Sequence, residues 1–246
     1  MELNDSKVFY SQPAVVEEYA RAANGVGLWR SEEKVFTRLF KPDDVLLEVG
    51  CGTGRIALGL WELGYHRLMG VDIAKGMIEE ARRINSVLEY GISFRVADAT
   101  KLPFADNEFD GAIFGFNGLM TIPSRVNRRA ALREILRVVR PGAWFAFTTH
   151  DRGDERYRDY WVEQETLWRE GRQLAGLVEF GDRWLDSPHG PQFIHIPSRE
   201  EILEDLAATG WRYEIDTDRA RLANESQQVH DFSGECRFWV AQKPAD

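Results

Sequence analysis

The sequence predicts an α/β fold built on a doubly wound parallel sheet. Segments with the pattern of strands alternate with segments of helical pattern from residue 42 to residue 150. The strand segments are almost continuously apolar, as strands are when helices cover both faces of a sheet. The first of them ends in a run of glycines, Gly50, Gly52 and Gly54. A doubly wound sheet places its ligand-binding crevice at such a strand end.

Two helices are expected before the first strand. Residues 14–23 and 31–40 carry apolar side chains at helical spacing, and Ser31 is the expected cap of the second helix. We expect these helices to lie over the sheet as a lid.

The alternation then runs in order along the chain. Of the helices that follow the first strand, the first ends at Gly64, the second ends at Gly91, and the third stops before Pro141, because glycine and proline stop helices. The predicted strands are 44–50, 66–72, 92–98, 109–117 and 143–151, and the predicted helices between them are 55–64, 76–91 and 124–140.

The rest of the chain departs from this rhythm. Residues 151–195 are rich in charged and aromatic residues and read as an insertion. Ser198 and Glu201 form a capping box that begins a helix. Residues 211–217 and 236–243 read as two further strands.

The predicted organisation is one domain over residues 1–246. Its parts are a helical lid at 1–41, a ligand-binding core at 42–150, an inserted cap at 151–195, and a C-terminal helix with two strands at 196–246.

Composition narrows the class of partner. The formal net charge of −9 disfavours a general binder of nucleic-acid backbones. The two cysteines, Cys51 and Cys236, are too few for a disulfide framework, so a reduced cytoplasmic compartment is the simplest expectation. Residues 1–20 lack the pattern of a signal peptide, and no apolar run is long enough to cross a membrane. We expect a cytoplasmic protein without membrane contact.

A ligand site is predicted where the first two strands end. Glycines let ligand atoms approach the backbone closely, and three of them follow the first strand. Asp72 closes the second strand, 22 positions after Gly50. An acidic residue there can accept hydrogen bonds from both hydroxyls of a ribose. Together the two features predict a ligand that contains a nucleoside.

The spacing of the glycines disfavours a dinucleotide. The dinucleotide fingerprint is G-x-G-x-x-G/A, whereas here Gly54 comes one place early and Arg55 begins the helix. Glu48, two residues before the first glycine, would repel a pyrophosphate and suit a ligand with an ammonium group. A nicotinamide-dependent dehydrogenase is therefore kept only as a third alternative.

The sequence resembles the class I S-adenosylmethionine-dependent methyltransferases of the small-molecule type. The resemblance rests on LLEVGCGTGRIALGL, GVDIAKGMIEEAR and VADATKLPFADNEFDGAIF, within roughly residues 42–150. It implies S-adenosylmethionine as cofactor and S-adenosylhomocysteine as product. It also implies a Rossmann-like sheet of seven strands, the last antiparallel, to which the two C-terminal strands would contribute.

The resemblance also implies which residues hold the cofactor. In the family, the loop E/D-x-G-x-G-x-G binds the methionine part, and the acidic end of the second strand binds the ribose. Carried over to this sequence, the implied residues of the loop and ribose site are Glu48, Gly50, Cys51, Gly52, Gly54 and Asp72.

The residue after Asp72 and the ends of the third and fourth strands complete the implied site. Ile73 would pack on the adenine, and Asp98 would meet its amino group beside the backbone of Ala99. The end of the fourth strand, at Asn117, would border the methionine tail and the transferred methyl group. Asn117 stands in FGFNGLM, which lacks the N/D-P-P-Y/F signature of relatives that methylate DNA adenine or protein amides.

His150 is the candidate catalytic base. It closes the fifth predicted strand beside the crevice, and its alternative role is that of a hydrogen-bonded histidine at a strand end. Asp151 could orient the imidazole or form a turn. His189 and His195 are expected on the surface or in packing, and the histidine spacing predicts no metal site.

Aromatic residues of the lid are further candidates for the cofactor site. Tyr19 and Trp29, with Tyr10, could close over the methionine end or the substrate. Their alternative role is to pack the lid helices on the sheet.

A basic helix leaves another function open. The segment 124–140 is crowded with arginines, namely Arg125, Arg128, Arg129, Arg133, Arg137 and Arg140. They could bind RNA or a protein, or form a solvated stripe beside the apolar face of the helix. No aromatic residues are interleaved with them, as base stacking would require.

We therefore predict S-adenosylmethionine-dependent methyl transfer to a small-molecule acceptor. The alternatives are RNA or protein methylation through the arginine face, and a nucleoside-binding protein without catalytic activity.

Overall fold

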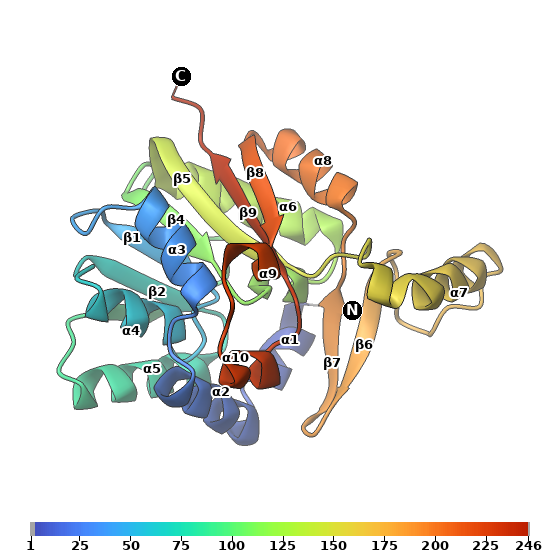
Figure 1. Cartoon of the computed structure of the whole chain (residues 1–246), viewed down its shortest axis with the longest axis horizontal. Coiled ribbons are helices and arrows are strands. Elements are labelled where there is room, and N and C mark those ends of the chain that lie inside the picture. The colour runs from blue at the N-terminus through green and yellow to red at the C-terminus, as the bar shows by residue number, and fades with distance from the viewer. Residues whose placement is uncertain (1–2, 246) are drawn as a thin grey trace.

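A seven-stranded sheet lies between two layers of helices in the computed structural model, which describes residues 3–245 (Figure 1). The strand order is β3-β2-β1-β4-β5-β9-β8. The strands are Leu46–Val49 (β1), Leu68–Asp72 (β2), Ser93–Val96 (β3), Phe109–Phe114 (β4), Val139–Thr149 (β5), Arg212–Asp218 (β8) and Arg237–Gln242 (β9). Strands β1 to β5 are parallel, and β9 is antiparallel to both β5 and β8. The predicted α/β fold, with its seventh strand antiparallel, is confirmed.

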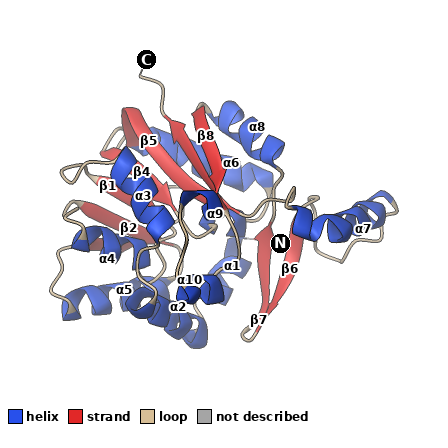
Figure 2. Ribbon diagram, viewed as in Figure 1, coloured by secondary structure: helices blue, strands red, loops and turns tan. Residues whose placement is uncertain are grey.

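Helices cover both faces of this sheet (Figure 2). One layer holds α3 (Arg30–Leu39), α4 (Arg55–Glu62) and α5 (Lys75–Val87), and the other holds α6 (Arg125–Val138) and α8 (Arg199–Thr209). Each layer shares a buried apolar cluster with the sheet. Val35, Ile56 and Ile78 belong to the first cluster, and Leu132 and Leu206 belong to the second. Burial on both faces explains why the central strands β1 and β4 are largely apolar. The edge strand β3 differs, because three of its four residues are exposed.

The remaining elements are a lid, a hairpin and short helices. They are α1 (Leu3–Tyr10), α2 (Pro13–Gly25), the 3-10 helices η1 (Gly118–Thr121) and η2 (Glu155–Tyr157), α7 (Arg158–Arg169), the hairpin β6 (Asp182–Ser187) and β7 (Gly190–His195), α9 (Arg219–Leu222) and α10 (Gln227–Phe232). Helix α2 packs on α4 and α5, and α1 packs on β7. Figure 1 shows α7 and the hairpin projecting from one side of the sheet. Residues 1–2 of the predicted lid, and residue 246, lie outside the described residues.

The structure corrects two predicted helix ends. The helix predicted at 124–140 ends at Val138, because Val139 already pairs with Phe109 as the first residue of β5. Pro141 contributes, because a proline disfavours helical backbone at the residue before it. The helix predicted to end at Gly91 ends at Val87, and a tight turn follows with Glu89 at φ +56°.

The predicted cap of α3 is also wrong. Ser31 lies inside the helix, and Trp29 is the N-cap residue. The side chain of Glu32 accepts a hydrogen bond from the backbone N–H of Trp29, 2.9 Å away. Half of the capping box predicted for α8 is confirmed, because Ser198 is the N-cap residue and accepts a hydrogen bond from the N–H of Glu201. The carboxylate of Glu201 does not complete the box and lies 2.7 Å from Nε2 of His195 instead.

No helix among residues 3–245 is both long and apolar enough to cross a membrane.

A buried ion pair joins α3 to the start of α4. Both guanidinium Nη atoms of Arg55 donate to the carboxylate of Glu32, each over 2.6 Å, and one also donates to the carbonyl of Gly27. The two side chains are 9% and 1% exposed. Burial alone would lower the pKa of Arg55, but the Glu32 carboxylate outweighs it and raises that pKa. The pair fixes the lid segment to the loop before α4.

We expect the Arg55→Met variant to lose about 3–5 kcal/mol of unfolding free energy, because it leaves the Glu32 carboxylate buried without a cation. The double variant Glu32→Leu/Arg55→Met removes both charges and should regain at least half of that loss. Urea denaturation, followed by circular dichroism, measures both.

The exposed pair Glu80–Arg83 supplies the control, because its arginine is 61% exposed. Arg83→Met should have a much smaller effect on the same curve. The single variant Glu32→Leu is measured as well. If the double variant loses as much unfolding free energy as the two single variants lose together, this role for the pair is contradicted.

Candidate active site

The glycine loop after β1 has a backbone that favours glycine. Gly50, Gly52 and Gly54 have φ values of +63°, +54° and +90°, a region that other residues rarely adopt. A Cβ on Gly50 would lie 2.5 Å from the ring of Phe114, and one on Gly54 would lie 2.9 Å from the ring of Phe94. The loop therefore needs these glycines for its turn and for its packing on neighbouring strands.

Asp72 links the end of β2 to this loop. Its Oδ2 accepts a hydrogen bond from the N–H of Gly52 over 3.0 Å, and its Oδ1 accepts one from the N–H of Ala74 over 2.8 Å. Burial raises the pKa of Asp72, and these backbone hydrogen bonds partly offset the effect. Each carboxylate oxygen can accept further hydrogen bonds. Asp72 therefore both shapes the loop and offers acceptors to a ligand.

The loop and three strand ends enclose a first cavity, called here the glycine-loop cavity. Many of its lining residues are those that the resemblance implies, namely Gly50, Gly52, Asp72, Ile73, Asp98 and Ala99. Tyr10, Tyr19 and Phe116 also line it. Asp98 uses Oδ1 to accept from the N–H and the hydroxyl of Thr100, each over 2.8 Å. Its Oδ2 has no hydrogen-bond partner among the described residues.

A smaller second cavity, the Glu48 cavity, adjoins the first. Glu48, Cys51 and Arg55 line it, together with Gly50 and Gly52, which border both cavities. The buried Glu48 accepts a hydrogen bond from the N–H of Ala57 over 2.9 Å. Burial raises the pKa of Glu48 to about 8, although nearby Arg55 acts against this.

Cys51 is buried in the loop, and burial raises the pKa of its thiol. It is a packing residue at a crowded turn and not a reactive thiolate.

A third cavity, the histidine cavity, contains His150. The Nδ1 of His150 lies 2.9 Å from the carbonyl oxygen of Glu235, and its Nε2 lies 3.2 Å from the amide nitrogen of Asn117. A carbonyl only accepts, so Nδ1 carries the hydrogen, and Nε2 then accepts from Asn117. Burial lowers the pKa of His150, which favours this neutral form.

The structure shows which group orients His150. Of the two roles considered for Asp151, the hydrogen bonds fit the turn, because its carboxylate accepts from the N–H of Gly153 and from Arg237. The orienting group is the carbonyl of Glu235, which sequence reasoning missed. This residue follows the short helix α10 and has no motif that could have indicated it.

Two aromatic residues separate the three cavities. Tyr19 and Phe116 border all of them, with ring centroids 5.9 Å apart. Phe232, which sequence reasoning also missed, stacks on Phe116 at 4.9 Å. Phe116 and Asn117 have φ values of +49° and +58°, and backbone strain of this kind gathers at functional sites.

Trp29 lies behind this wall and lines none of these three cavities. It is 1% exposed. Its ring packs edge-on against Phe116 at 5.7 Å, and the guanidinium of Arg55 lies 4.7 Å from the ring centroid. Its contacts are those of a packing residue.

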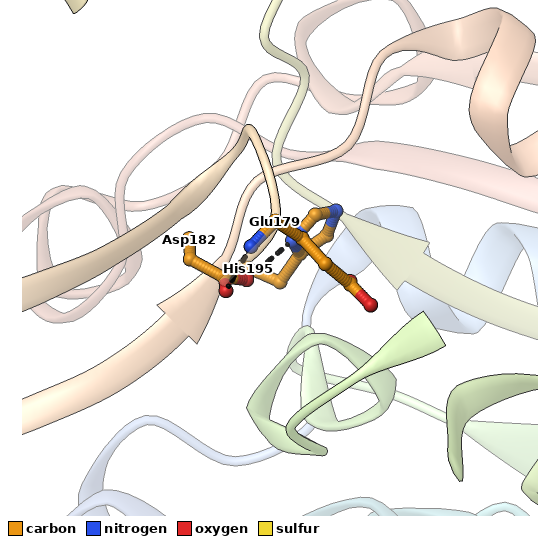
Figure 3. Close-up of side chains that lie close together, drawn as sticks. All are labelled: Glu179, Asp182 and His195. Atoms are coloured by element: carbon orange, nitrogen blue, oxygen red, sulfur yellow. Dashed lines mark hydrogen bonds and ion pairs between the residues drawn. The ribbon is translucent and has the colours of Figure 1, made fainter. Parts of the chain in front are cut away.

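A separate cluster of ionisable groups lies at the base of the β6–β7 hairpin (Figure 3). Ligand atoms of Glu179, Asp182 and His195 lie within 4.8 Å of one another. His195 was expected on the surface or in packing, and it is buried. Its Nδ1 lies 2.8 Å from Asp182, and its Nε2 lies 2.7 Å from Glu201.

The atoms of this cluster are already engaged with protein groups. Arg128 pairs with Glu179 over 2.6 Å, and Asp182 accepts from the backbone N–H of Glu179 over 2.9 Å. The arrangement is that of a buried ion-pair network that holds the hairpin against α6 and α8.

The arginines of α6 are largely paired with carboxylates. Arg125 and Arg129 both bind Asp205, and Arg137 binds Glu134 and Asp106. Arg140, predicted on the helix, lies in β5 and pairs with Asp110. Little unneutralised positive charge is left on this face for a nucleic-acid backbone.

Comparisons with known proteins agree with this geometry. Residues 47–147 match the family described as "Methyltransferase domain". The chain is 39% identical over 103 residues to the O-methyltransferase resE of Aspergillus sclerotiorum, a match covering 41% of this chain and 38% of that protein. It is 35% identical over 127 residues to the demethylmenaquinone methyltransferase of Symbiobacterium thermophilum, a match covering 48% of this chain and 48% of that protein. These matches span less than half the length of both curated relatives.

A solved structure shows the same fold. A SAM-dependent methyltransferase from Methanosarcina mazei superposes with a TM-score of 0.68 at 22% identity, covering 86% of this chain and 98% of that one. The family match over residues 47–147, the relatives and the shared fold together support assignment of the chain to the class I S-adenosylmethionine-dependent methyltransferase superfamily.

Proposed function

We propose that this protein transfers a methyl group from S-adenosylmethionine to a small-molecule acceptor. One observation carries the proposal. The glycine-loop cavity, lined by Asp72 and Asp98, meets the histidine cavity at Tyr19 and Phe116. A cofactor in the first cavity and an acceptor in the second would therefore meet at a wall of two aromatic side chains. In this proposal the core at 42–150 binds the cofactor, while the lid at 1–41 and the cap at 151–195 enclose the acceptor.

The residues present suit S-adenosylmethionine. Asp72 would hold the ribose, and the free Oδ2 of Asp98 would accept from the adenine amino group. Ile73 would pack on the adenine, and Glu48 would face the ammonium group. When bound, the cofactor supplies a methyl group already activated on a sulfonium, so the protein has mainly to orient the acceptor.

The chain's own groups then have two tasks. Tyr19, Phe116 and Phe232 keep water away from the junction of the cavities. His150 would take the acceptor's proton at Nε2, at the side of the histidine cavity, once the acceptor displaces the amide of Asn117 from that atom. The curated relatives support a small acceptor, because one is named an O-methyltransferase and the other acts on demethylmenaquinone by its name.

The Asp72→Ala variant should weaken binding of S-adenosylmethionine by about tenfold or more, because it removes charged hydrogen-bond acceptors from the ribose site. Calorimetric titration measures the dissociation constants, with S-adenosylhomocysteine and NAD as companion ligands. We expect S-adenosylhomocysteine to bind and NAD not to bind.

Asp43→Ala removes an exposed carboxylate and is the control. Thermal denaturation checks that Asp72→Ala still folds, because Asp72 also supports the glycine loop. Equal affinity of the wild type and Asp72→Ala would refute the ribose assignment. Binding of NAD alone would refute the proposed function.

Binding of S-adenosylmethionine near pH 7 should release protons from Glu48. The pKa of Glu48 is about 8 in the free protein, so the group is mostly protonated at pH 7, and a bound ammonium would favour its ionised form. Calorimetry in buffers of different ionisation enthalpy counts the protons. The release should shrink as the pH rises past about 8.

Glu48→Gln keeps the shape of the side chain and should abolish this release. The same number of released protons in the wild type and in Glu48→Gln would show that Glu48 does not face the ammonium group.

Histidine NMR can test the state of His150 without an acceptor. We expect the Nδ1–H tautomer and a pKa below the ordinary 6.5. Asn117→Gly should raise the pKa of His150, because it removes the amide that donates to Nε2 of the neutral imidazole. Glycine is chosen because it tolerates the backbone at φ +58°.

Asn107→Gly is a matched control, since Asn107 also has φ +58° but lies on an exposed loop. An unchanged pKa of His150 in Asn117→Gly, or an Nε2–H tautomer in the wild type, would exclude the arrangement described above.

A further inference from the structure

We propose that the acceptor is an uncharged, mainly apolar molecule that presents a hydroxyl group to His150. This inference rests on the proposed function and follows from the side chains that line the histidine cavity. Each kind of lining group restricts the acceptor in a different way.

Apolar and polar side chains both line the wall. The apolar part comes from the N-terminal helices, the hairpin, the end of β4 and α10, and includes Phe9, Val15, Phe116, Leu185, Ile194 and Phe232. Aromatic and aliphatic walls of this kind favour a guest that buries apolar surface.

The polar groups of the wall are largely bonded to one another. The amide of Gln192 donates to the hydroxyl of Tyr10 over 2.5 Å. The hydroxyl of Ser187 donates to the carbonyl of Gly190, and that of Thr121 donates to the carbonyl of Gly118. A ligand with many polar groups would have to break these hydrogen bonds.

The cavity offers no cation to a ligand anion. Among the described residues that line it there is no lysine or arginine, and Glu18 is its one carboxylate, 2.7 Å from His189. A carboxylate or phosphate would lose its hydration without gaining a partner. Glu18 would also repel it.

Arginines near His150 lie outside this lining. Arg183, Arg219 and Arg156 help to lower the pKa of His150, but none of them borders the cavity. Arg156 pairs with Asp154, and Arg219 lies 3.7 Å from Glu235.

His150 and Asn117 supply the remaining polar end. The single lone pair of His150 Nε2 is taken by the amide of Asn117, whereas the Oδ1 of the buried Asn117 has no partner among the described residues. A ligand hydroxyl would donate to Oδ1, or to Nε2 in place of that amide, so this end suits a ligand group that donates a hydrogen. A hydroxyl does so and, once deprotonated, is also a strong nucleophile.

In the proposed transfer, the hydroxyl oxygen would form a bond to the methyl carbon while the carbon–sulfur bond breaks, and the electron pair of that bond would stay on sulfur, leaving a neutral thioether. The hydroxyl would displace the amide of Asn117 from Nε2 of His150, and its proton would pass to Nε2 and from there to solvent.

Three probes of one shape test the inference, namely 2-naphthol, 2-naphthylamine and 2-naphthoate. Fluorescence titration in the presence of saturating S-adenosylhomocysteine measures their binding to the whole chain. We expect 2-naphthol to bind and 2-naphthoate to bind at least about tenfold more weakly, since its carboxylate has no partner. With tritiated S-adenosylmethionine, methyl transfer to saturating 2-naphthol should exceed transfer to 2-naphthylamine.

Gln192→Arg places a cation in the wall and should reverse the preference, so that 2-naphthoate binds more tightly than 2-naphthol. Val162→Arg adds the same charge on α7, where the side chain is 59% exposed, and should leave the preference unchanged.

Equal or tighter binding of 2-naphthoate to the wild type would overturn the inference. So would the failure of all three probes to bind, methylation of the amine alone, or no transfer to saturating 2-naphthol. Calorimetric binding of S-adenosylhomocysteine in the same preparation separates these results from failure of the proposed function. If that ligand does not bind, the proposed function and this inference fall together.

Discussion

The buried ion pair between Glu32 and Arg55 fixes α3 to the start of α4 and, through Trp29, supports the aromatic wall of the site. Arg55 begins α4 directly after the glycine loop, and Glu32 lies in the first turn of α3. A charge pair this deeply buried tolerates little displacement, because either partner alone would face a large desolvation cost. The same guanidinium lies over the ring of Trp29, which in turn packs on Phe116. The aromatic wall is therefore positioned through contacts that start at the loop.

This chain of contacts explains the strained backbone at the end of β4. Phe116 must face the three cavities while Asn117 reaches His150, and the N–H of Asn117 donates to the hydroxyl of the buried Thr148 over 2.8 Å. Two successive residues with positive φ satisfy both demands. Such a conformation persists only where surrounding contacts enforce it. The packing of Trp29, Phe232 and Thr148 around this turn provides that enforcement.

The sequence predicts the part of the site that parallel strands bring together. Asp72 and the glycines are far apart in sequence, but the carboxyl ends of adjacent parallel strands meet, so their proximity could be inferred. Glu235 and Phe232 could not be inferred, because they lie in a segment of short helices between β8 and β9 that has no periodic pattern. The position of Trp29 in the N-terminal segment predicts a place near the cofactor. Its burial depends instead on contacts with Arg55 and Phe116. These contacts join distant segments of the chain, so no local sequence pattern reveals them.

The hairpin is held differently at its base and at its tip. The base of the hairpin carries the buried network of His195, Asp182 and Glu201, in which loss of one partner would strand a charge. Its tip is held to the lid by His189 and Glu18, whose side chains are 20% and 46% exposed, and ion pairs as accessible as this one contribute little. The contact at the tip is thus the cheaper one to break. The stronger contact at the base therefore keeps Ile194 and Gln192 in place along the wall of the histidine cavity.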